Sequence, residues 1–301
     1  MNSLYKPPVL FLVFNRPEPT FQVFEAIREA RPEKLYVAAD GPRSSRPGEA
    51  ESCAQVRRVV DRVDWPCQVQ TLFREQNVGC RRAVSEAITW FFESEEEGII
   101  LEDDCLPSPD FFRFCGESLG TYRSEPRVMH IGGHVLLEAP DKEDLFFSRL
   151  VPIWGWATWR RAWNTFDTEM SRIEELDQLP LREWYGSQAT NVRKAIRRIH
   201  DDKVDAWGAR WVLSVLVNDG LSILPRSNLI SNIGFGKDAT HTKVDSHMAN
   251  QPLGELSETL VRKPDMSSDP AYDETYLRIM NRKSHLGKRL INKLQELCAR
   301  N

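Results

Sequence analysis

The first third of the chain alternates strand-like segments with helical patterns, and this alternation restricts the possible folds more than any other feature. The strand-like segments are Val9–Phe14, Lys34–Ala39 and Gln68–Phe73. Each ends at turn residues and is followed by apolar residues at helical spacing. Repeated strand–helix alternation predicts a parallel sheet with right-handed crossovers. We therefore expect an α/β protein with a Rossmann-like, mostly parallel sheet flanked by helices.

A fourth predicted strand ends in three consecutive carboxylates. Ile99–Leu101 is apolar throughout, as expected for a strand covered on both faces, and Glu102, Asp103 and Asp104 follow it directly. Two carboxylates about 5 Å apart repel by roughly 3 kcal/mol at an effective dielectric constant near 20. This cost favours a bound cation, and Mg²⁺ or Mn²⁺ takes few protein carboxylates, completing its shell with water and phosphate. An acidic surface turn is the alternative.

Composition excludes several classes of protein. A chain of 301 residues with 41% hydrophobic and 28% charged residues is typical of a globular protein with a sizeable core. The net charge of −4 argues against a nucleic-acid partner. The six cysteines form no Cys-x-x-Cys pair, which argues against structural zinc and favours free thiols in a reducing cytosol. No secretory signal and no apolar run of bilayer-spanning length is present.

The remainder of the chain is less regular. The predicted elements there are a helix at Phe111–Tyr122 and strands at Arg127–Gly132, Leu221–Leu224 and Asn228–Ile233. The polar stretch Lys243–Asp273 predicts an extended linker or mobile loop. We therefore divide the chain into one domain at 1–242 and a linker with a helical tail at 243–301.

Polar residues follow the first three strands. Arg16 and Asp40 come just after the first and second strands, so both should lie at the sheet edge that carries the acidic cluster. An Asp there can accept a hydrogen bond from a base or ribose, and an Arg can pair with phosphate. Asn77, Gly79 and Arg82 lie where a helix begins, and its free N–H groups suit a diphosphate. Ordinary turn and helix-start chemistry explains the same residues.

The order of four short motifs resembles a known family. The motifs are Val-Phe-Asn-Arg-Pro (13–17), Ala-Ala-Asp-Gly-Pro (38–42), Asn-Val-Gly-Cys-Arg-Arg-Ala (77–83) and Leu-Glu-Asp-Asp-Cys-Leu-Pro-Ser (101–108). They are similar to motifs of nucleotide-sugar-dependent glycosyltransferases with the GT-A fold. The likeness is to bacterial family-2-like enzymes and, more distantly, to Golgi N-acetylglucosaminyltransferases. It covers roughly residues 9–242. It implies a nucleotide-binding half at 1–112 and an acceptor half at 113–242 of the domain.

The resemblance implies roles for individual residues. Arg16, Asp40 and Asp103 would hold the nucleotide sugar, and Asp104 would bind a divalent cation, Mn²⁺ or Mg²⁺, that acts as a Lewis acid on the leaving diphosphate. A late His completes the metal shell in many such enzymes, and His241 is the matching residue. A solvated loop His is the alternative reading of His241.

Tryptophans mark the expected acceptor side. The segment Ile153–Trp159 looks like a family signature, and indole faces stack on pyranose rings. We expect Trp154 and Trp156 at the sugar site and the other tryptophans in packing, where large apolar side chains usually lie. Gly155 would let the backbone approach a ligand closely.

The candidate catalytic base is Asp205. Inverting transfer needs a base near the acceptor hydroxyl, and Asp205–Trp211 resembles the stretch that supplies one. The family pattern has an acid directly after the first Trp, but here Gly208 follows Trp207. Asp205 is the nearest substitute.

These observations predict a metal-dependent, inverting hexosyltransferase-type enzyme of polysaccharide biosynthesis. Its partners would be a nucleoside diphosphate sugar and a glycan or surface-polymer acceptor. The alternatives are a non-catalytic nucleotide-sugar sensor or partner-binding subunit, and a metal-dependent nucleotidyltransferase. We expect a cytoplasmic protein. The leucine stripe and basic residues of Lys283–Ala299 predict contact with the inner face of an anionic membrane or with a partner. Packing against the chain's own domain is the alternative.

Overall fold

The computed structural model describes residues 5–138, 143–202, 204–234, 249–261 and 265–281. An eight-stranded sheet runs through the centre in the order β3-β2-β1-β4-β8-β6-β9-β7. Its strands are β1 (Val9–Val13), β2 (Lys34–Ala39), β3 (Gln68–Phe73), β4 (Glu97–Glu102), β6 (Val128–Gly132), β7 (Leu145–Ser148), β8 (Trp156–Trp159) and β9 (Leu221–Pro225). All run in one direction except β7 and β8, which are antiparallel to their neighbours. The predicted mostly parallel α/β fold is confirmed.

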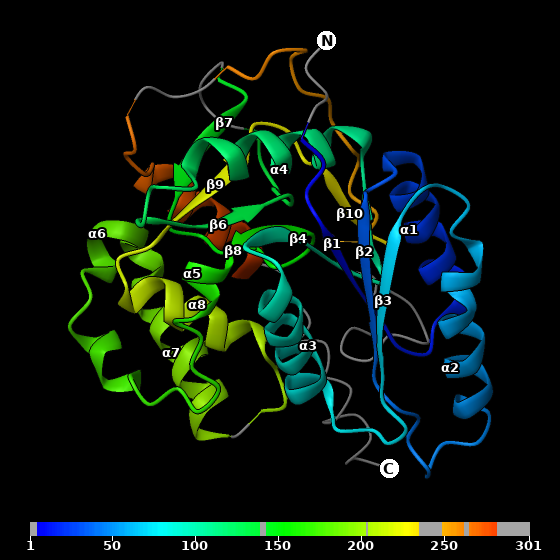
Figure 1. The fold of residues 1–301 in the computed structure, drawn as a ribbon. Coiled ribbons are helices and arrows are strands. Elements are labelled where there is room, and N and C mark those ends of the chain that lie inside the picture. The colour runs from blue at the N-terminus through cyan, green and yellow to red at the C-terminus, as the bar shows by residue number, and fades with distance from the viewer. Residues whose placement is uncertain (1–4, 139–142, 203, 235–248, 262–264, 282–301) are drawn as a thin grey trace, which may run out of the picture.

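Helices cover both faces of the sheet (Figure 1). One face carries α1 (Pro17–Ala30), α2 (Glu49–Arg57) and α4 (Pro109–Tyr122). The opposite face carries α3 (Cys80–Ser94), α5 (Arg160–Trp163) and α8 (Gly208–Val217). Beyond them lie α6 (Leu181–Tyr185) and α7 (Ala189–Asp201), with three short 3₁₀ turns at Arg58–Arg62, Ile173–Asp177 and Gly186–Gln188.

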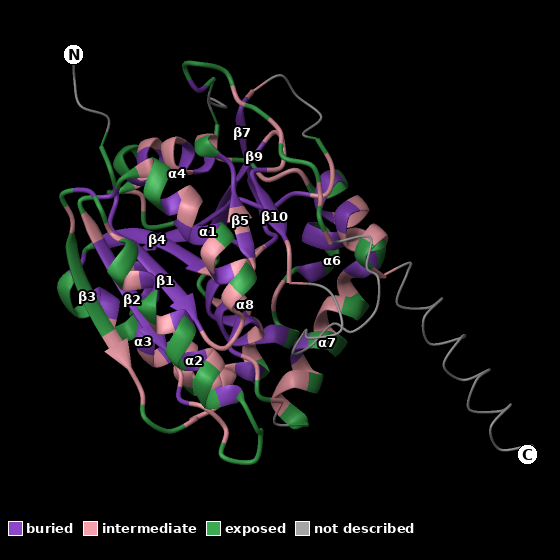
Figure 2. Ribbon diagram, turned by 90° about the vertical axis from the view of Figure 1, so that its right-hand side faces the viewer, coloured by how far each residue is buried: buried purple, intermediate pink, exposed green. Residues whose placement is uncertain are grey.

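Side-chain alternation along the strands divides the core into two layers. Val9 and Phe11 of β1 pack toward α1 and α4, whereas Leu10 and Leu12 pack toward α3. The central strands are buried because both faces are covered, and the edge strand β3 is mostly exposed (Figure 2). An apolar run without a polar face is therefore what a central strand of this sheet requires.

The turn after the acidic strand is fixed by a small second sheet. β5 (Cys105–Pro107) pairs antiparallel with β10 (Ile230–Asn232). The N–H of Ile233 also donates to the carbonyl of Asp104 at 2.8 Å. This pairing brings the end of the predicted late strand against the acidic cluster.

The predicted linker is partly held against the domain. The Asp144 carboxylate accepts hydrogen bonds from the N–H groups of Ser257 and Val261 at 3.0 and 2.9 Å. Residues 270–281 form a helix whose Asp273 accepts hydrogen bonds from Ser148 Oγ and the Arg149 N–H. The described part of 243–273 thus packs on the domain, because Asp144 binds its backbone and its own Asp273 binds Ser148 and Arg149.

The basic tail helix predicted at 283–299 lies outside the described residues. Among the helices that the structure does describe, none has both the length and the apolar character needed to cross a bilayer. The five cysteines within those residues are free thiols.

Candidate functional site

A cavity of about 710 Å³ opens at the carboxyl ends of β1, β2, β3 and β4. Its other walls come from the start of α3, from the segment that joins α7 to α8, and from Asn232 and Gly234. It brings together eight of the residues predicted from the sequence: Arg16, Asp40, Asn77, Gly79, Asp103, Asp104, Trp154 and Asp205. Ligands of open α/β sheets bind at this edge, so the cavity is the candidate active site.

An arginine from the turn between β1 and α1 contacts the acidic cluster. Arg16 directly precedes α1, and its guanidinium bridges two carboxylates: Nη2 contacts Asp103 Oδ1, and Nη1 lies 3.1 Å from Asp104 Oδ2. The second oxygen of Asp103 is buried and has no hydrogen-bond partner. Arg16 therefore compensates one of the two negative charges and does not satisfy all of the acceptors.

Glu102 is the third carboxylate of the cluster. It pairs in register with Leu12 of β1 and so shares the α3 face of the sheet. It lines the cavity, and no described residue donates a hydrogen bond to it. Burial, reinforced by the neighbouring carboxylates Asp104 and Asp103, raises the pKa of Glu102. Burial also raises the pKa of Asp103, and the charge of Arg16 opposes that rise.

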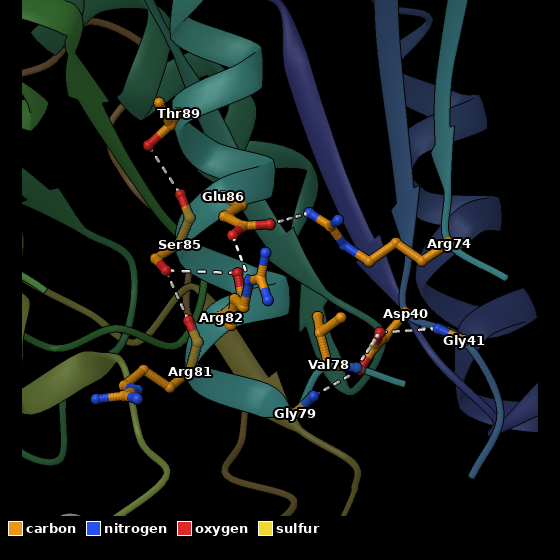
Figure 3. Close-up of polar contacts among 10 residues, drawn as sticks. All are labelled: Asp40, Gly41, Arg74, Val78, Gly79, Arg81, Arg82, Ser85, Glu86 and Thr89. Carbon is orange, nitrogen blue, oxygen red and sulfur yellow. Dashed lines mark hydrogen bonds and ion pairs between the residues drawn. The ribbon is translucent and has the colours of Figure 1, made fainter. Parts of the chain in front are cut away.

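Asp40 organises the loop that precedes α3 (Figure 3). Its carboxylate accepts hydrogen bonds from the N–H groups of Gly41, Val78 and Gly79 and from the Asn77 side chain, at 2.8–3.2 Å. Four donors match the roughly four lone-pair sites of a carboxylate. Hydrogen bonds within the chain thus occupy the acceptor sites of the Asp40 carboxylate. Asp40 would therefore affect a ligand through the loop that it holds in place.

Asp205 caps the N-terminus of α3 across the cavity. Its Oδ2 and Oδ1 accept the N–H groups of Cys80 and Arg81, each at 3.0 Å. Gly79 makes room for this contact, since a Cβ there would lie 2.8 Å from Asp205 Oδ2. Its φ of +87° also favours glycine. Each oxygen of Asp205 keeps one lone pair for another donor.

The two tryptophans predicted at the sugar site separate. Trp154 lines the cavity and contacts the His134 ring edge-on, with centroids 4.8 Å apart. Trp156 is fully buried in the core, where it stacks on Trp207 at 5.6 Å, because it belongs to β8 in the middle of the sheet. Gly155 has a φ of +59°, and a Cβ there would lie 2.3 Å from Ile230. Its small size serves this packing, and it does not line the cavity.

Arg82 was also predicted at the site, but it is not among the described residues that line the cavity. Arg82 points outward from α3 and pairs with Glu86 at 2.6 Å (Figure 3), because its helix presents that face to solvent. His241 lies outside the described residues. His130 is a core residue: its Nε2 lies 2.9 Å from the carbonyl of Pro152, and burial lowers its pKa to about 3.

The residues present are a partial match for a divalent cation. The described residues contain no cluster of three or more His, Cys, Asp or Glu side chains arranged to hold a metal. Asp103 and Asp104 nevertheless face the cavity with one buried oxygen unpartnered. Two carboxylates with substrate phosphates and water suit Mg²⁺ or Mn²⁺, so the site fits a cation that arrives with a phosphorylated ligand.

Several cavity residues were not singled out from the sequence. Arg43 and Arg74 line the cavity; Arg43 pairs with Glu49, and Arg74 pairs with Glu86 at 2.7 Å. Both follow strands, as Arg16 and Asp40 do, so the position after each strand end was the available signal. Asn232 enters through the pairing of β10 with β5, which no local pattern announces.

No protein-family model matches this sequence, and no curated protein matches it. Several solved structures are similar to it in fold. One is the mannosyltransferase PcManGT from Pyrobaculum calidifontis in complex with GDP-Man and Mn²⁺, with 13% identity, a TM-score of 0.40, and 71% of this chain and 70% of that chain covered. Another is a UDP-glucose pyrophosphorylase complexed with UDP-glucose, with 10% identity, a TM-score of 0.37, and 76% and 93% covered. A third is HddC from Yersinia pseudotuberculosis, with 8% identity, a TM-score of 0.33, and 52% and 77% covered. Likeness at this level leaves the function to be argued from the cavity.

Proposed function

We propose that this protein transfers a sugar from a nucleoside diphosphate sugar to a glycan or surface-polymer acceptor, with inversion at the anomeric carbon. The observation that carries the proposal is the cavity at the strand ends. Its lining contains both the Arg16–Asp103–Asp104 cluster and the residues Trp154 and Asp205. An anion site and a carboxylate facing one space are the two requirements of such a transfer.

The donor end is the cluster with the loop at residues 77–79. Arg16 provides a planar guanidinium that suits phosphate oxygens, and Asp40 holds the loop rigid beside it. A divalent cation, Mn²⁺ or Mg²⁺, would be held by Asp104 and Asp103 and would stabilise charge on the leaving diphosphate. His241 remains a proposed further ligand.

The acceptor end contains Trp154 and Asp205. Trp154 presents an aromatic surface to the cavity, which suits the C–H face of a sugar ring. Asp205 is the proposed base: a free lone pair on each oxygen can take the proton from an acceptor hydroxyl as the new bond forms. Its place at the helix start holds it rigidly.

A non-catalytic nucleotide-sugar-binding protein is the second candidate. Gly208 stands where the resembling enzymes carry an acid, and both oxygens of Asp205 already accept N–H groups. The third candidate is a nucleotidyltransferase. It would transfer the nucleotidyl group of a nucleoside triphosphate to a sugar phosphate and release diphosphate, and so form a nucleotide sugar instead of consuming one.

One experiment separates the three. Melting temperatures are first measured with UDP and GDP, with and without Mn²⁺. Each stabilising nucleotide is then offered as its sugar derivative with mixed glycan acceptors and, in a separate reaction, as its triphosphate with a sugar phosphate. Release of nucleoside diphosphate together with glycosylated acceptor is the expected result. Binding without any turnover supports the sensor, and turnover only of a nucleoside triphosphate with a sugar phosphate supports the nucleotidyltransferase.

Asp104 tests the donor site directly. Asp104→Asn should lower the affinity for nucleoside diphosphate in the presence of Mn²⁺ by about tenfold or more, since the diphosphate charge is less compensated. Calorimetry measures this, and Asp110→Asn, an acid of α4 that pairs with Arg113, is the control. Equal affinities of the parent and Asp104→Asn would refute the role of Asp104.

A further inference from the structure

We propose that Arg16 is the resident cation of the Asp103–Asp104 pair, and that a divalent metal replaces it there only when a donor diphosphate draws Arg16 away. The inference rests on the proposed function for its donor and metal. It adds a property that the proposed function does not contain: the binding of metal and of donor would be conditional on each other.

The contacts show why Arg16 occupies the cation position. Its guanidinium reaches both carboxylates at once, with Nη2 on Asp103 and Nη1 3.1 Å from Asp104 Oδ2. Its side chain is 19% exposed and that of Asp103 only 5%, so water screens the pair weakly. A guanidinium stays protonated at any working pH, and the positive charge is therefore permanent.

A metal and Arg16 would compete for the same two carboxylates. Gly234 packs directly on the pair, since a Cβ there would lie 2.3 Å from Asp104 Oδ2 and 2.6 Å from Arg16 Nη1. A metal bound to the same two carboxylates would place its charge within a few ångströms of the guanidinium. Repulsion between like charges at that distance disfavours joint occupancy.

Arg16 neither neutralises both carboxylates nor fills all of their acceptor sites. Asp103 Oδ2 is buried without a partner among the described residues, so an oxygen ligand is available once Arg16 moves. The cavity gives Arg16 a place to go, because both line it. Phosphate oxygens accept two parallel N–H bonds from a guanidinium, as a carboxylate does. A diphosphate can thus take Arg16 while the metal takes the acids.

Such an exchange couples two binding reactions. Metal alone must displace Arg16 without compensation, and diphosphate alone must pull Arg16 from a buried acid pair. When both bind, the diphosphate replaces the carboxylates as the partner of Arg16, and the metal replaces Arg16 as the cation of the carboxylates. Linkage then requires the affinities for metal and for diphosphate to rise by the same factor. Arg16 is a positioning residue in this scheme, and coupling is the property that reports on it.

Calorimetry with Mn²⁺ tests the scheme. Affinities for Mn²⁺ are measured without nucleotide and with saturating UDP or GDP, on the parent and on Arg16→Gln. We expect nucleotide to raise the Mn²⁺ affinity of the parent by about tenfold or more. In Arg16→Gln the affinity for Mn²⁺ alone should rise by about tenfold or more, and the effect of nucleotide should shrink accordingly.

Arg43→Gln is the matched control. Arg43 lines the same cavity and carries the same charge, but it pairs with Glu49 and not with the acidic cluster. Its substitution should leave the affinity for Mn²⁺ alone within about twofold of the parent. Equal gains in Arg43→Gln and Arg16→Gln would overturn the proposal, because loss of any cavity charge would then explain the result.

Melting temperatures give a second readout. Arg16→Gln leaves the buried Asp103 without its cation, so its melting temperature should fall, and Mn²⁺ should restore it more than it stabilises the parent. If Arg16→Gln fails to fold, Arg16→Lys keeps the charge with a single contact point and should show a smaller gain in affinity for Mn²⁺ alone. No gain in either variant overturns the proposal. Absence of Mn²⁺ binding even with nucleotide would overturn the proposed metal dependence as well, which separates the two failures.

Discussion

Asp205 serves two purposes that a single substitution can separate. As a helix cap it needs only acceptor oxygens, whereas a catalytic base must also be basic. Asp205→Asn keeps the shape and one acceptor oxygen but is not basic. We expect sugar transfer to fall by roughly 100- to 10,000-fold with nucleotide affinity unchanged. Initial rates with saturating donor, together with calorimetry, measure both quantities.

Glu102 provides the comparison for Asp205. Like Asp205 and Asp40, it lines the cavity and has no ion-pair partner among the described residues, but no described residue donates a hydrogen bond to its carboxylate. It lies on the face of the sheet that packs against α3. Glu102→Gln should preserve transfer better than Asp205→Asn does. If transfer instead survives in Asp205→Asn and collapses in Glu102→Gln, Asp205 is only a cap.

At the scale of elements, Gly79 shows how a loop fixes a catalytic candidate. Gly79→Ala would force an alanine to a φ of +87° and place its Cβ 2.8 Å from Asp205 Oδ2. We expect the free energy of unfolding to fall by about 1–3 kcal/mol and transfer to decrease, because Asp205 must shift. Urea denaturation and initial rates measure the two effects.

Gly120→Ala is the control for Gly79→Ala. Gly120 lies in α4 on the exposed side, and a Cβ there meets nothing within 4 Å. Alanine is the better helix former, so this variant should be equal to the parent or up to about 1 kcal/mol more stable. A loss of stability as large as that in Gly79→Ala would mean that the contact with Asp205 is not the cause.

The elements also show what the sequence could predict. β2 and β3 have the predicted bounds, and β1 differs by one residue, because strand alternation and turn residues are local signals. β8 was not predicted as a strand. Trp156 was predicted at the sugar site, and the antiparallel pairing of β8 between β4 and β6, which buries it completely, shows that it is a core residue.

The contacts within the candidate site that the sequence did not predict join segments that lie far apart in the chain. The positions of Arg16 and Asp40 at one sheet edge followed from strand ends, and the structure places both in the cavity. Their partners did not follow. Asp40 binds a loop 37–39 residues away, and Asp205 reaches a helix start 125 residues earlier. Such distances have no local sequence pattern.

At the scale of the whole molecule, the C-terminal region is attached to the sheet through a buried acid. Asp273 lies in the helix at residues 270–281 and is fully buried against Ser148 of β7 and the backbone of Arg149. Burial raises its pKa to about 7, although both hydrogen bonds favour the ionised form. Protonation at this one residue therefore affects how the last described helix holds to the domain.

The pH dependence of stability tests this attachment. A carboxyl group with a raised pKa in the folded state still binds a proton between pH 4 and 7, where the unfolded chain has released it. Its stabilising contribution is present below pH 4 and is lost as the pH rises toward 7. Asp273→Asn removes this titration and keeps one acceptor oxygen, which can still accept the Arg149 N–H. The stability of the variant relative to the parent should thus increase with pH across this window, by at most about 1.4 kcal/mol per pH unit. Urea denaturation at pH 4–8 measures these free energies of unfolding. The control is Asp265→Asn at an exposed position, which should follow the parent. If the free energies of Asp273→Asn and the parent differ by the same amount at every pH, burial of Asp273 does not govern the attachment.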